Sequence, residues 1–414
     1  MKRKILVIHN GYPLRGDGGD KVRTLNMLQS LDSIGFDVCL LAFFKKDFSL
    51  LALNKKSVPS NIKSYFIFTL PDRWGFGGIA ALFRAVITWI IVKCNHIELI
   101  QLETSLSASC VRYLKKNILV VTDFHADPVP ELQMNGRTKS SINRAEKDVC
   151  YALSRSQRII AVSNNLANNL KKYYSYDCPF SILPCSFNSE KFHIDPAQMI
   201  ALREKMHLKE RIVLCYLGGL QKWQCVEETL DIFLRLKKKD DRYFLCIYTN
   251  DDLTPFAKKI ELLGNDCLCM SLRYEQVPLY LSIIDAGFVL RHNSLVNINA
   301  SPTKIAEYMA VGAMVIATKY SGDAKVLVED SGYGMILDEI ENISSEMIDE
   351  LNLKIHSYKE NKENALNTLP DTLAEVNLSA QNVTIWTKAD ADEDALRKAI
   401  RDAGYLPLRT TEKV

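Results

Sequence analysis

The chain has 414 residues, of which 47% are hydrophobic and 24% are charged. This length and composition exclude a disordered or fibrous protein and suffice for two α/β domains, each with its own hydrophobic core. The apolar run at the start is too short for a signal peptide, so we expect a cytoplasmic protein whose eleven irregularly spaced cysteines are reduced. Cys267 and Cys269 fall within one predicted strand and are too few for a zinc site, so no metal is expected.

The net charge of +3 is unevenly distributed along the chain. Residues 1–180 hold 25 Lys and Arg against 14 Asp and Glu, whereas residues 181–414 hold 27 against 35. The basic first half indicates an anionic partner, such as a lipid surface or a phosphate-bearing acceptor, and the alternative is a solvated basic face. No nucleic-acid-binding motif accompanies this charge, so no nucleic-acid partner is expected.

Short apolar, β-branched runs alternate with helical patterns along the first half of the chain. Strands are predicted over residues 4–10, 37–44, 64–70, 97–103, 117–125, 157–163 and 180–185. Helices are predicted over residues 21–35, 75–92, 105–115 and 164–174, with a further long helix through Glu146. This βαβ rhythm predicts a doubly wound parallel sheet, which we assign to a domain of residues 1–188.

A second series of the same kind follows a polar stretch near residues 186–210 that has the character of an interdomain linker. Its strands are predicted over residues 211–218, 243–249, 266–272, 286–291, 313–318 and 334–338. We assign them to a domain of residues 189–368. The predicted fold class is α/β, with two Rossmann-like parallel-sheet domains facing a cleft where ligands bind.

The tail over residues 369–414 does not continue this rhythm. It is predicted to form two strands, an acidic turn and a helix that ends at Gly404. It resembles the second half of a heavy-metal-associated, ferredoxin-like module, but no cysteine follows Cys269, so no metal is expected there. The tail is an appended module, a fusion remnant or a divergent terminus.

The segment over residues 75–92 has nearly the length of a membrane span. Arg84 near its middle and its frequent glycines argue against a true span. Two interpretations remain open, a helix lying on a bilayer surface with Trp89 at the headgroup boundary and an unusually apolar buried helix.

A Ser-Pro-Thr-Lys turn lies directly before a predicted helix at residues 301–304. Ser301 is placed to cap this helix, and Pro302 suits its first turn. The unpaired N–H groups and positive dipole end of a helix form an anion site, to which Lys304 adds a charge. Glu307, one turn further on, is placed to accept hydrogen bonds from ribose hydroxyls. The pattern therefore predicts a nucleoside diphosphate at this helix start.

Residues 301–318, together with 216–224 and 9–28, resemble the family 4 glycosyltransferases of the GT-B fold, in particular bacterial enzymes of surface polysaccharide biosynthesis. The resemblance covers nearly all of residues 1–360. It implies a nucleotide-sugar donor, with UDP favoured, and a glycan or lipid-linked acceptor. It also implies hexosyl or N-acetylhexosaminyl transfer with retention of configuration at the cytoplasmic face of the cell membrane.

The resemblance assigns roles residue by residue. The predicted donor-binding residues are Gly18, Gly19, Gly218, Gly219, Lys222, Arg291, Ser301, Pro302, Thr303, Lys304 and Glu307. Lys21 and Arg23 are predicted to bind the acceptor. His125 resembles the histidine that contacts the transferred sugar, and with Lys304 and Glu307 it makes up the predicted catalytic set. Glu146 falls where the family has a glutamate, although a solvated helix charge is the simpler interpretation.

Two positions depart from the family's pattern. Asn299 stands where many members carry the first glutamate of a Glu-x7-Glu pair, and Gly219 replaces a basic residue. Arg291 is the candidate for the missing positive charge. No Asp-x-Asp motif lies in the predicted cleft loops, so fixed cations rather than a metal are expected to stabilise the leaving diphosphate.

Rival interpretations follow from these departures. A catalytically silent GT-B scaffold that binds a nucleotide or a partner is one, and a GT-B sugar-nucleotide epimerase is another. A nicotinamide dehydrogenase is disfavoured because no G-x-G-x-x-G opens a helix after the first strand.

Overall fold

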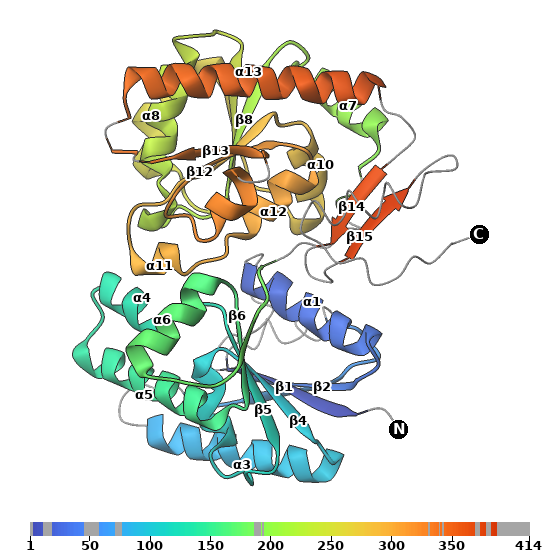
Figure 1. The fold of residues 1–414 in the computed structure, drawn as a ribbon, viewed down its shortest axis with the longest axis vertical. Helices are drawn as coiled ribbons and strands as arrows, with labels where there is room; N and C mark the ends of the chain where they lie inside the picture. Colours follow the sequence, from blue (N-terminus) through green and yellow to red (C-terminus); the bar gives the residue numbers. More distant parts are fainter. Residues whose placement is uncertain are drawn as a thin grey trace.

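The computed structural model describes two sheet-containing domains stacked along the long axis of the molecule (Figure 1). The described residues are 3–10, 19–44, 58–70, 77–185, 192, 194–329, 332–338, 340–341, 343–368, 373–377 and 382–386. For residues 19–22 and 362–368 and for the two tail strands, the description is of the backbone.

The N-terminal domain is built on a seven-stranded parallel sheet of order β3-β2-β1-β4-β5-β6-β7. Its strands are β1 (Lys4–Asn10), β2 (Asp37–Phe44), β3 (Lys63–Phe68), β4 (Leu99–Glu103), β5 (Leu119–Phe124), β6 (Arg158–Ala161) and β7 (Phe180–Ile182). Its helices are α1 (Gly19–Ser33), α3 (Gly77–Asn95), the 3₁₀ helix η1 (Ser105–Val111), α4 (Pro128–Met134), α5 (Lys139–Arg155) and α6 (Asn164–Tyr174).

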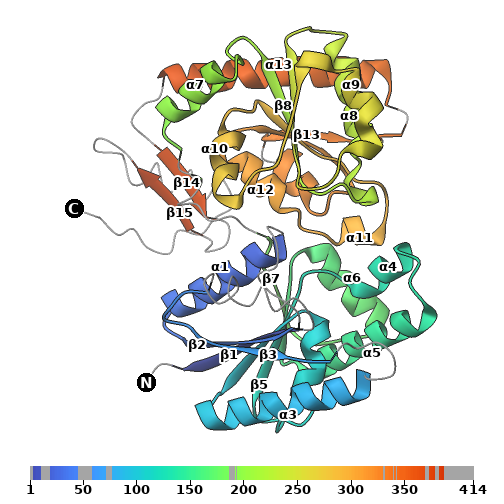
Figure 2. The ribbon, with the colours of Figure 1, turned by 180° about the vertical axis from the view of Figure 1, so that it is seen from behind.

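The central strand β1 is apolar on both faces because helices cover both sides of the sheet (Figure 2). Ile5 and Val7 pack into a core that includes Leu28 of α1. Leu6 and Ile8 point the other way, into a core that includes Ile91 of α3. Because both faces of β1 are buried, its sequence is continuously hydrophobic and does not alternate between apolar and polar residues.

The C-terminal domain has a six-stranded parallel sheet of order β10-β9-β8-β11-β12-β13. Its strands are β8 (Ile212–Leu217), β9 (Tyr243–Tyr248), β10 (Cys267–Met270), β11 (Ala286–Val289), β12 (Met314–Thr318) and β13 (Gly334–Leu337). Its α-helices are α7 (Pro196–Lys205), α8 (Val226–Lys237), α9 (Ala257–Glu261), α10 (Val277–Ser282), α11 (Leu295–Ile298), α12 (Thr303–Ala310) and α13 (Ser345–Thr368). Short turns of helix complete it: η3 (Lys222–Gln224), η4 (Thr254–Phe256), η5 (Gly264–Asp266), η6 (Tyr274–Gln276) and the π-helical η7 (Lys325–Glu329).

The predicted fold class is confirmed, since both series of strands form parallel sheets with helices. One element differs. The helix predicted over residues 105–115 is a 3₁₀ helix that ends at Val111. The Ser107 hydroxyl donates to the Glu103 carbonyl and accepts from the Asn10 amide. Such side-chain bonds to the backbone compete with an α-helical ladder.

Helix α3 has one buried face and one exposed face. The interpretation as a buried helix therefore fits only its inner face, and a helix lying on a bilayer remains an interpretation of its outer face. Its length and composition would allow it to cross a membrane. Arg84, Thr88, Ile91 and Val92 are buried against the domain. The opposite face presents a continuous exposed apolar stripe of Ile79, Leu82, Phe83, Val86, Trp89 and Ile90, which we call the α3 stripe.

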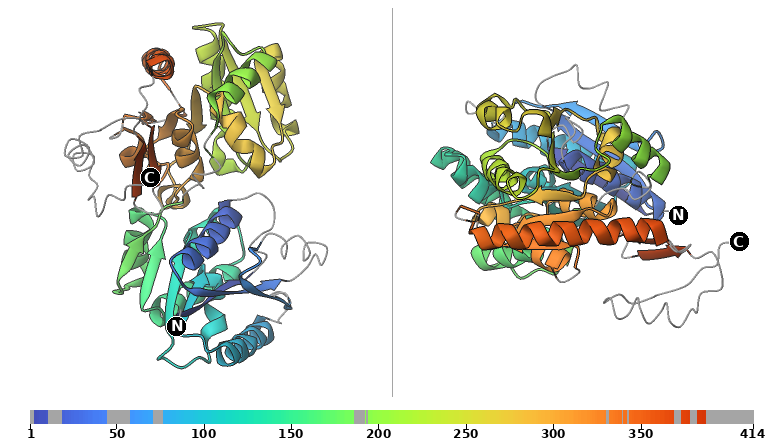
Figure 3. Two further views of the ribbon diagram at one scale, coloured as in Figure 1. Left: turned by 90° about the vertical axis from the view of Figure 1, so that its right-hand side faces the viewer. Right: turned by 90° about the horizontal axis from the view of Figure 1, so that it is seen from above.

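The tail forms the two predicted strands, β14 (Leu373–Asn377) and β15 (Asn382–Trp386), as an antiparallel pair. The pair follows α13 and lies beside the two stacked domains (Figure 3). The predicted acidic turn and the helix that ends at Gly404 lie outside the described residues.

The segment that precedes α12 joins the two domains. The Ser163 hydroxyl at the start of α6 donates to the Asn299 carbonyl at 2.8 Å. The Asn165 amide donates to the Ile298 carbonyl at 3.2 Å, and the Asn169 amide donates to the Asn299 side chain. The loop that opens α12 is therefore held by α6 of the other domain.

Candidate functional site

A cavity of about 570 Å³ lies between the domains, within the range of small-molecule sites. The first domain contributes Arg23, His125 and Cys185. The second contributes the ends of its strands and the start of α12, namely Leu217, Gly218, Gly219, Gln221, Trp223, Gln224, Tyr248, Thr249, Asn250, Asp251, Leu272, Tyr274, Val277, Arg291, Val296, Asn297, Ala300, Ser301, Pro302, Thr303, Lys304 and Glu307. The predicted cleft between the sheets is thus a cavity lined by both domains.

The start of α12 opens onto this cavity. The N-cap residue is Pro302, and no side chain caps the helix. The prediction that Ser301 caps α12 is therefore wrong. Its hydroxyl instead accepts from the Cys185 amide of the chain leaving the first domain, at 3.0 Å. The first N–H groups of α12 are left without a side-chain cap, as an anion site requires.

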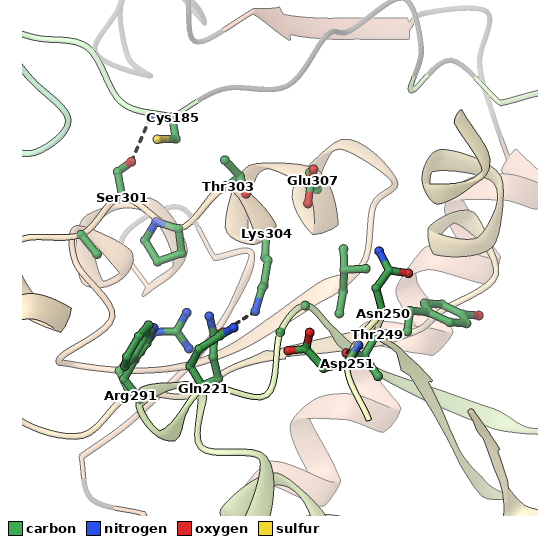
Figure 4. Close-up of a pocket in the computed structure, with 18 of the residues that line it drawn as sticks. Cys185, Gln221, Thr249, Asn250, Asp251, Arg291, Ser301, Thr303, Lys304 and Glu307 are labelled. Carbon is green, nitrogen blue, oxygen red and sulfur yellow. Dashed lines mark hydrogen bonds between the residues drawn. The ribbon is translucent and has the colours of Figure 1, made fainter. Parts of the chain in front are cut away.

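Two cations meet below this helix start (Figure 4). Lys304 extends from α12 and donates to the Gln224 side-chain carbonyl at 2.8 Å. Arg291, which is 5% exposed, donates to the carbonyl of the neighbouring Leu290 at 2.7 Å. Burial lowers the pKa of Lys304, and the Arg291 charge lowers it further. Two close positive charges in a partly buried place favour an anionic ligand, which would offset their repulsion.

Glu307 lies one turn along the same helix and is 8% exposed. Burial raises its pKa to about 7, although the Lys304 charge acts in the opposite direction. Glu307 lines the cavity. When its carboxyl group is ionised, it can accept hydrogen bonds from a ligand.

The backbone at Gly218 approaches Lys304 closely. A Cβ atom at Gly218 would lie 2.5 Å from Lys304 Nζ, and its φ of +136° is a conformation that residues with side chains rarely adopt. The Gly218 amide donates to the Tyr248 carbonyl at 2.9 Å, and the Asp251 carboxylate accepts from the Leu220 amide at 2.7 Å. The loop after β8 is thereby held to the end of β9.

The first-domain wall contains His125 and Arg23. His125 Nε2 lies 3.2 Å from Glu103 Oε2 and 3.4 Å from Asp123 Oδ2. Arg23 makes a two-pronged ion pair with Asp123, from Nε at 3.0 Å and from Nη2 at 2.9 Å. Although burial opposes it, the Asp123 charge raises the pKa of Arg23. Arg23 was predicted to bind the acceptor, but its charge is already committed to Asp123.

The other predicted residues divide between cavity and surroundings. Gly218, Gly219, Arg291, Pro302 and Thr303 line the cavity with Ser301, Lys304, Glu307 and His125. Lys222 is exposed on η3 and does not line the cavity, unlike the other predicted donor-binding residues of this domain. Gly19 is the first residue of α1, whereas Gly18 and the Lys21 side chain lie outside the described residues.

Asn299 stands where the family's pattern has the first glutamate of the pair. It is buried, is absent from the cavity lining, and accepts from Asn169 in the other domain. This position is therefore a domain contact. The exposed Glu146 likewise does not line the cavity, in line with the solvated interpretation.

Several cavity residues belong to no sequence motif that marked them as part of the site. Thr249, Asn250 and Asp251 line it because they follow β9, whose neighbour in the sheet is β8. The rule that ligands bind at the carboxyl ends of parallel strands would have found them once the strand order was known. Gly322, which is outside the cavity lining, also belongs to no such motif, although a Cβ there would overlap the Ala300 carbonyl beside the start of α12.

Comparison with known proteins agrees with this geometry. The model described as "Glycosyltransferase Family 4" matches residues 17–191, and "Glycosyl transferases group 1" matches residues 199–367, so the two cover most of the chain. The chain is a family 4-like GT-B glycosyltransferase.

Relatives of this glycosyltransferase are distant in sequence. An uncharacterized glycosyltransferase of Methanocaldococcus jannaschii, MJ1069, is 22% identical over 61% of this chain, and the match spans 64% of that relative's length. The structure of Anabaena Alr3699/HepE in complex with UDP has a TM-score of 0.63 at 17% identity, over 88% of this chain and 91% of that one. WaaG, a glycosyltransferase involved in lipopolysaccharide biosynthesis, has a TM-score of 0.61 at 13% identity, over 88% and 95%.

Replacing Lys304 tests the anion site. Lys304→Ala should weaken UDP binding by at least about 30-fold, or about 2 kcal/mol, because a charged hydrogen-bond donor to the diphosphate is lost. Calorimetry should show a smaller loss for uridine, which carries no phosphate. The exposed Lys222→Ala serves as the matched control and should bind UDP as the unaltered protein does. Equal losses in the two variants would contradict this site.

Replacing Gly218 tests the close backbone approach. Gly218→Ala should lower stability by about 1–3 kcal/mol through its strained φ and should also weaken UDP binding, because Lys304 must move. Gly264→Ala is the matched control, since Gly264 has a φ of +52° and open space around it. Thermal unfolding should show a loss in both variants, and UDP affinity should fall only in the first. If Gly218→Ala retained its UDP affinity, the close approach of the Gly218 backbone to Lys304 would not be required for UDP binding.

Proposed function

We propose that this glycosyltransferase moves a hexosyl or N-acetylhexosaminyl group from a UDP-sugar to a glycan or lipid-linked oligosaccharide. The acceptor belongs to surface polysaccharide biosynthesis, and the anomeric configuration is retained. The observation that carries the proposal is the pair of cations, Lys304 and Arg291, at the uncapped start of α12 in a cavity between two domains. HepE, whose structures hold UDP and UDP-glucose, and WaaG, named for lipopolysaccharide biosynthesis, support this choice of donor and acceptor.

In the proposed reaction the acceptor oxygen forms a bond to the anomeric carbon while the bond from that carbon to the β-phosphate oxygen breaks. The acceptor approaches from the face that the diphosphate leaves, so configuration is retained. The acceptor proton passes to the departing β-phosphate, and UDP is the second product. Lys304, Arg291 and the α12 amides stabilise the charge that develops on this leaving group, and no metal ion is required for that role.

Glu307 is proposed to accept hydrogen bonds from the ribose hydroxyls. In Figure 4 its carboxyl group lies one turn along α12 from Lys304, and the proposal puts the ribose of the nucleotide beside it. Closure of the two domains around the donor would orient the acceptor and exclude water.

Sugar transfer itself is the decisive measurement. UDP-glucose, UDP-N-acetylglucosamine and GDP-mannose are each incubated with the protein and a lipid-linked saccharide, with and without EDTA. We expect one UDP-sugar to give a lengthened saccharide by mass spectrometry, with unchanged anomeric configuration by NMR and an unchanged rate in EDTA. An inverted product, or loss of the rate in EDTA, would overturn that part of the proposal.

The same assay separates the two rival functions. Absence of both sugar transfer and donor hydrolysis with every sugar nucleotide would favour the silent scaffold. A changed sugar nucleotide without a lengthened acceptor would identify an epimerase.

We further propose that the protein acts as a peripheral enzyme on the cytoplasmic face of the cell membrane, docked through the α3 stripe. Its six apolar side chains follow helical spacing and are each more than two-fifths exposed, which is unusual for a surface that meets only water. Exposed Lys93 ends α3, and exposed Arg112, Lys115 and Lys116 follow η1, which packs against α3. An apolar stripe with basic residues beside it suits an anionic bilayer surface.

Vesicle binding tests this docking. The double variant Phe83→Gln, Trp89→Gln should bind vesicles of mixed zwitterionic and anionic phospholipid at least about tenfold more weakly, because two inserted rings are lost. Ile34→Gln, at a residue that is 70% exposed on the other side of the sheet, is the control. Reversing Lys115 and Lys116 to glutamate should remove the preference for anionic lipid. No binding of the unaltered protein in sedimentation would overturn the proposal.

A further inference from the structure

Two buried carboxylates meet one imidazole behind the first-domain wall of the cavity. Glu103 and Asp123 are register partners at the ends of β4 and β5, and they are 1% and 0% exposed. His125 follows two residues after Asp123, and its Nε2 lies within 3.2 Å of Glu103 and 3.4 Å of Asp123. One ring nitrogen therefore faces both acids while the ring itself lines the cavity.

Among the described residues in ion-pair contact with the two carboxylates, Arg23 supplies one positive charge and a doubly protonated His125 supplies the second. Both Asp123 oxygens accept from Arg23, so that pair is neutral as a unit. Glu103 Oε1 accepts from the uncharged Gln101 amide at 2.7 Å, which leaves Glu103 Oε2 facing His125. A neutral imidazole would leave a net negative charge in a buried place, which is unfavourable.

Other titratable groups of the described residues lie near the cluster. His9 on β1 is the register partner of Glu103 on its other side. The Cys185 thiol lies close enough to Arg23 to interact with its charge. Lys304 and Arg291 belong to the opposite wall of the cavity. Among the described residues, His125 is the group whose ring nitrogen lies within ion-pair distance of Glu103, at 3.2 Å.

We propose that Glu103 is a positioning residue that keeps His125 doubly protonated, so that His125 meets its ligand as a fixed cation and not as a general base. Asp123, neutralised by Arg23, orients the ring as the second acceptor of the Nε2 proton. The identity of the ligand rests on the proposed function, whereas the charge of His125 does not.

The direction of the ionisation agrees with this geometry. Burial works against the charged form of His125, but its contacts with Asp123 and Glu103 raise its pKa to about 10 from an ordinary 6.5. Because the folded pKa lies above the unfolded one, the resulting stability is fully present below about pH 6.5. It is lost as the pH rises through about 10.

The positive charge of His125 determines which group can accept the proton in the proposed sugar transfer. An imidazolium cannot take the proton of the acceptor hydroxyl, so that proton must leave by another path, which fits its passage to the departing phosphate. With Lys304 and Arg291 opposite, His125 places a positive charge on the other wall of the cavity. A donor diphosphate would therefore lie between cations contributed by both domains.

The decisive experiment is an NMR titration of the His125 ring, assigned by its absence in His125→Gln. We expect no titration of His125 between pH 5.5 and 8.5, whereas Glu103→Gln should bring its midpoint down into this range. Glu98→Gln, at an exposed carboxylate where β4 begins, is the matched control and should change nothing. A midpoint near 6.5 in the unaltered protein would overturn the proposal, and that measurement needs no variant to fold.

Binding gives a second readout. His125→Lys keeps a positive charge and should retain more UDP affinity than His125→Gln, which we expect to lose about tenfold. Equal losses would show that charge is not what His125 contributes. The pH profile of kcat/KM in the unaltered enzyme should carry the ionisation of Glu307 near 7, and Glu103→Gln should add a second limb from His125. Absence of any sugar transfer would refute the proposed function, yet the NMR result would still decide the charge of His125.

Discussion

Repulsion between Lys304 and Arg291 is the constraint on which the cavity depends. Both cations lie in one partly buried place, and burial together with the neighbouring charge lowers the pKa of Lys304. The chain does not neutralise them with a well-paired carboxylate, since the nearby Glu307 itself has a pKa raised to about 7. An anion supplied from solution offsets this repulsion, so the site is suited to a ligand that carries phosphate.

The backbone around these cations keeps them in place. Gly218 allows the loop after β8 to lie against Lys304, and the Asp251 carboxylate and the Tyr248 carbonyl hold that loop to β9. The turn before α12 is held from the other domain by Ser163 and Asn169. Binding at α12 is therefore mechanically linked to the relative position of the domains, which is the property that a cleft enzyme needs for closure.

The cations on the two walls of the cavity differ in their partners. On the first-domain side, Arg23 and His125 are balanced by buried Asp123 and Glu103, so the cations are fixed before any ligand arrives. On the second-domain side, Lys304 donates to the Gln224 side chain and Arg291 to the Leu290 carbonyl, and no ion pair with a carboxylate joins either cation among the described residues. The first arrangement supplies orientation and the second supplies the attraction for an anion.

Local signals determined the elements of this protein. Apolar β-branched runs predicted the strands, and the Ser-Pro-Thr-Lys turn predicted an anion-binding helix start, because strand burial and helix initiation depend on residues a few positions apart. Gly35, with a φ of +96°, follows the end of α1, and the Phe36 amide donates back to the Leu31 carbonyl. The helix-start pattern placed Lys304 and Glu307, the search for a missing positive charge placed Arg291, and the family resemblance placed His125, and all four line one cavity.

Only the tertiary structure decided which side chains became partners. Arg23 and Asp123 are 100 residues apart, and Asn169 and Asn299 are 130 apart, so their contacts depend on strand order and domain docking. For that reason Ser301 proved to be a link to Cys185 instead of a cap, and Lys222 proved to lie outside the cavity. Glu103 had no motif of its own, since its role arises from the register of β4 with β5. Sequence periodicity reports which face of an element is buried, whereas sheet order and register decide what that face meets.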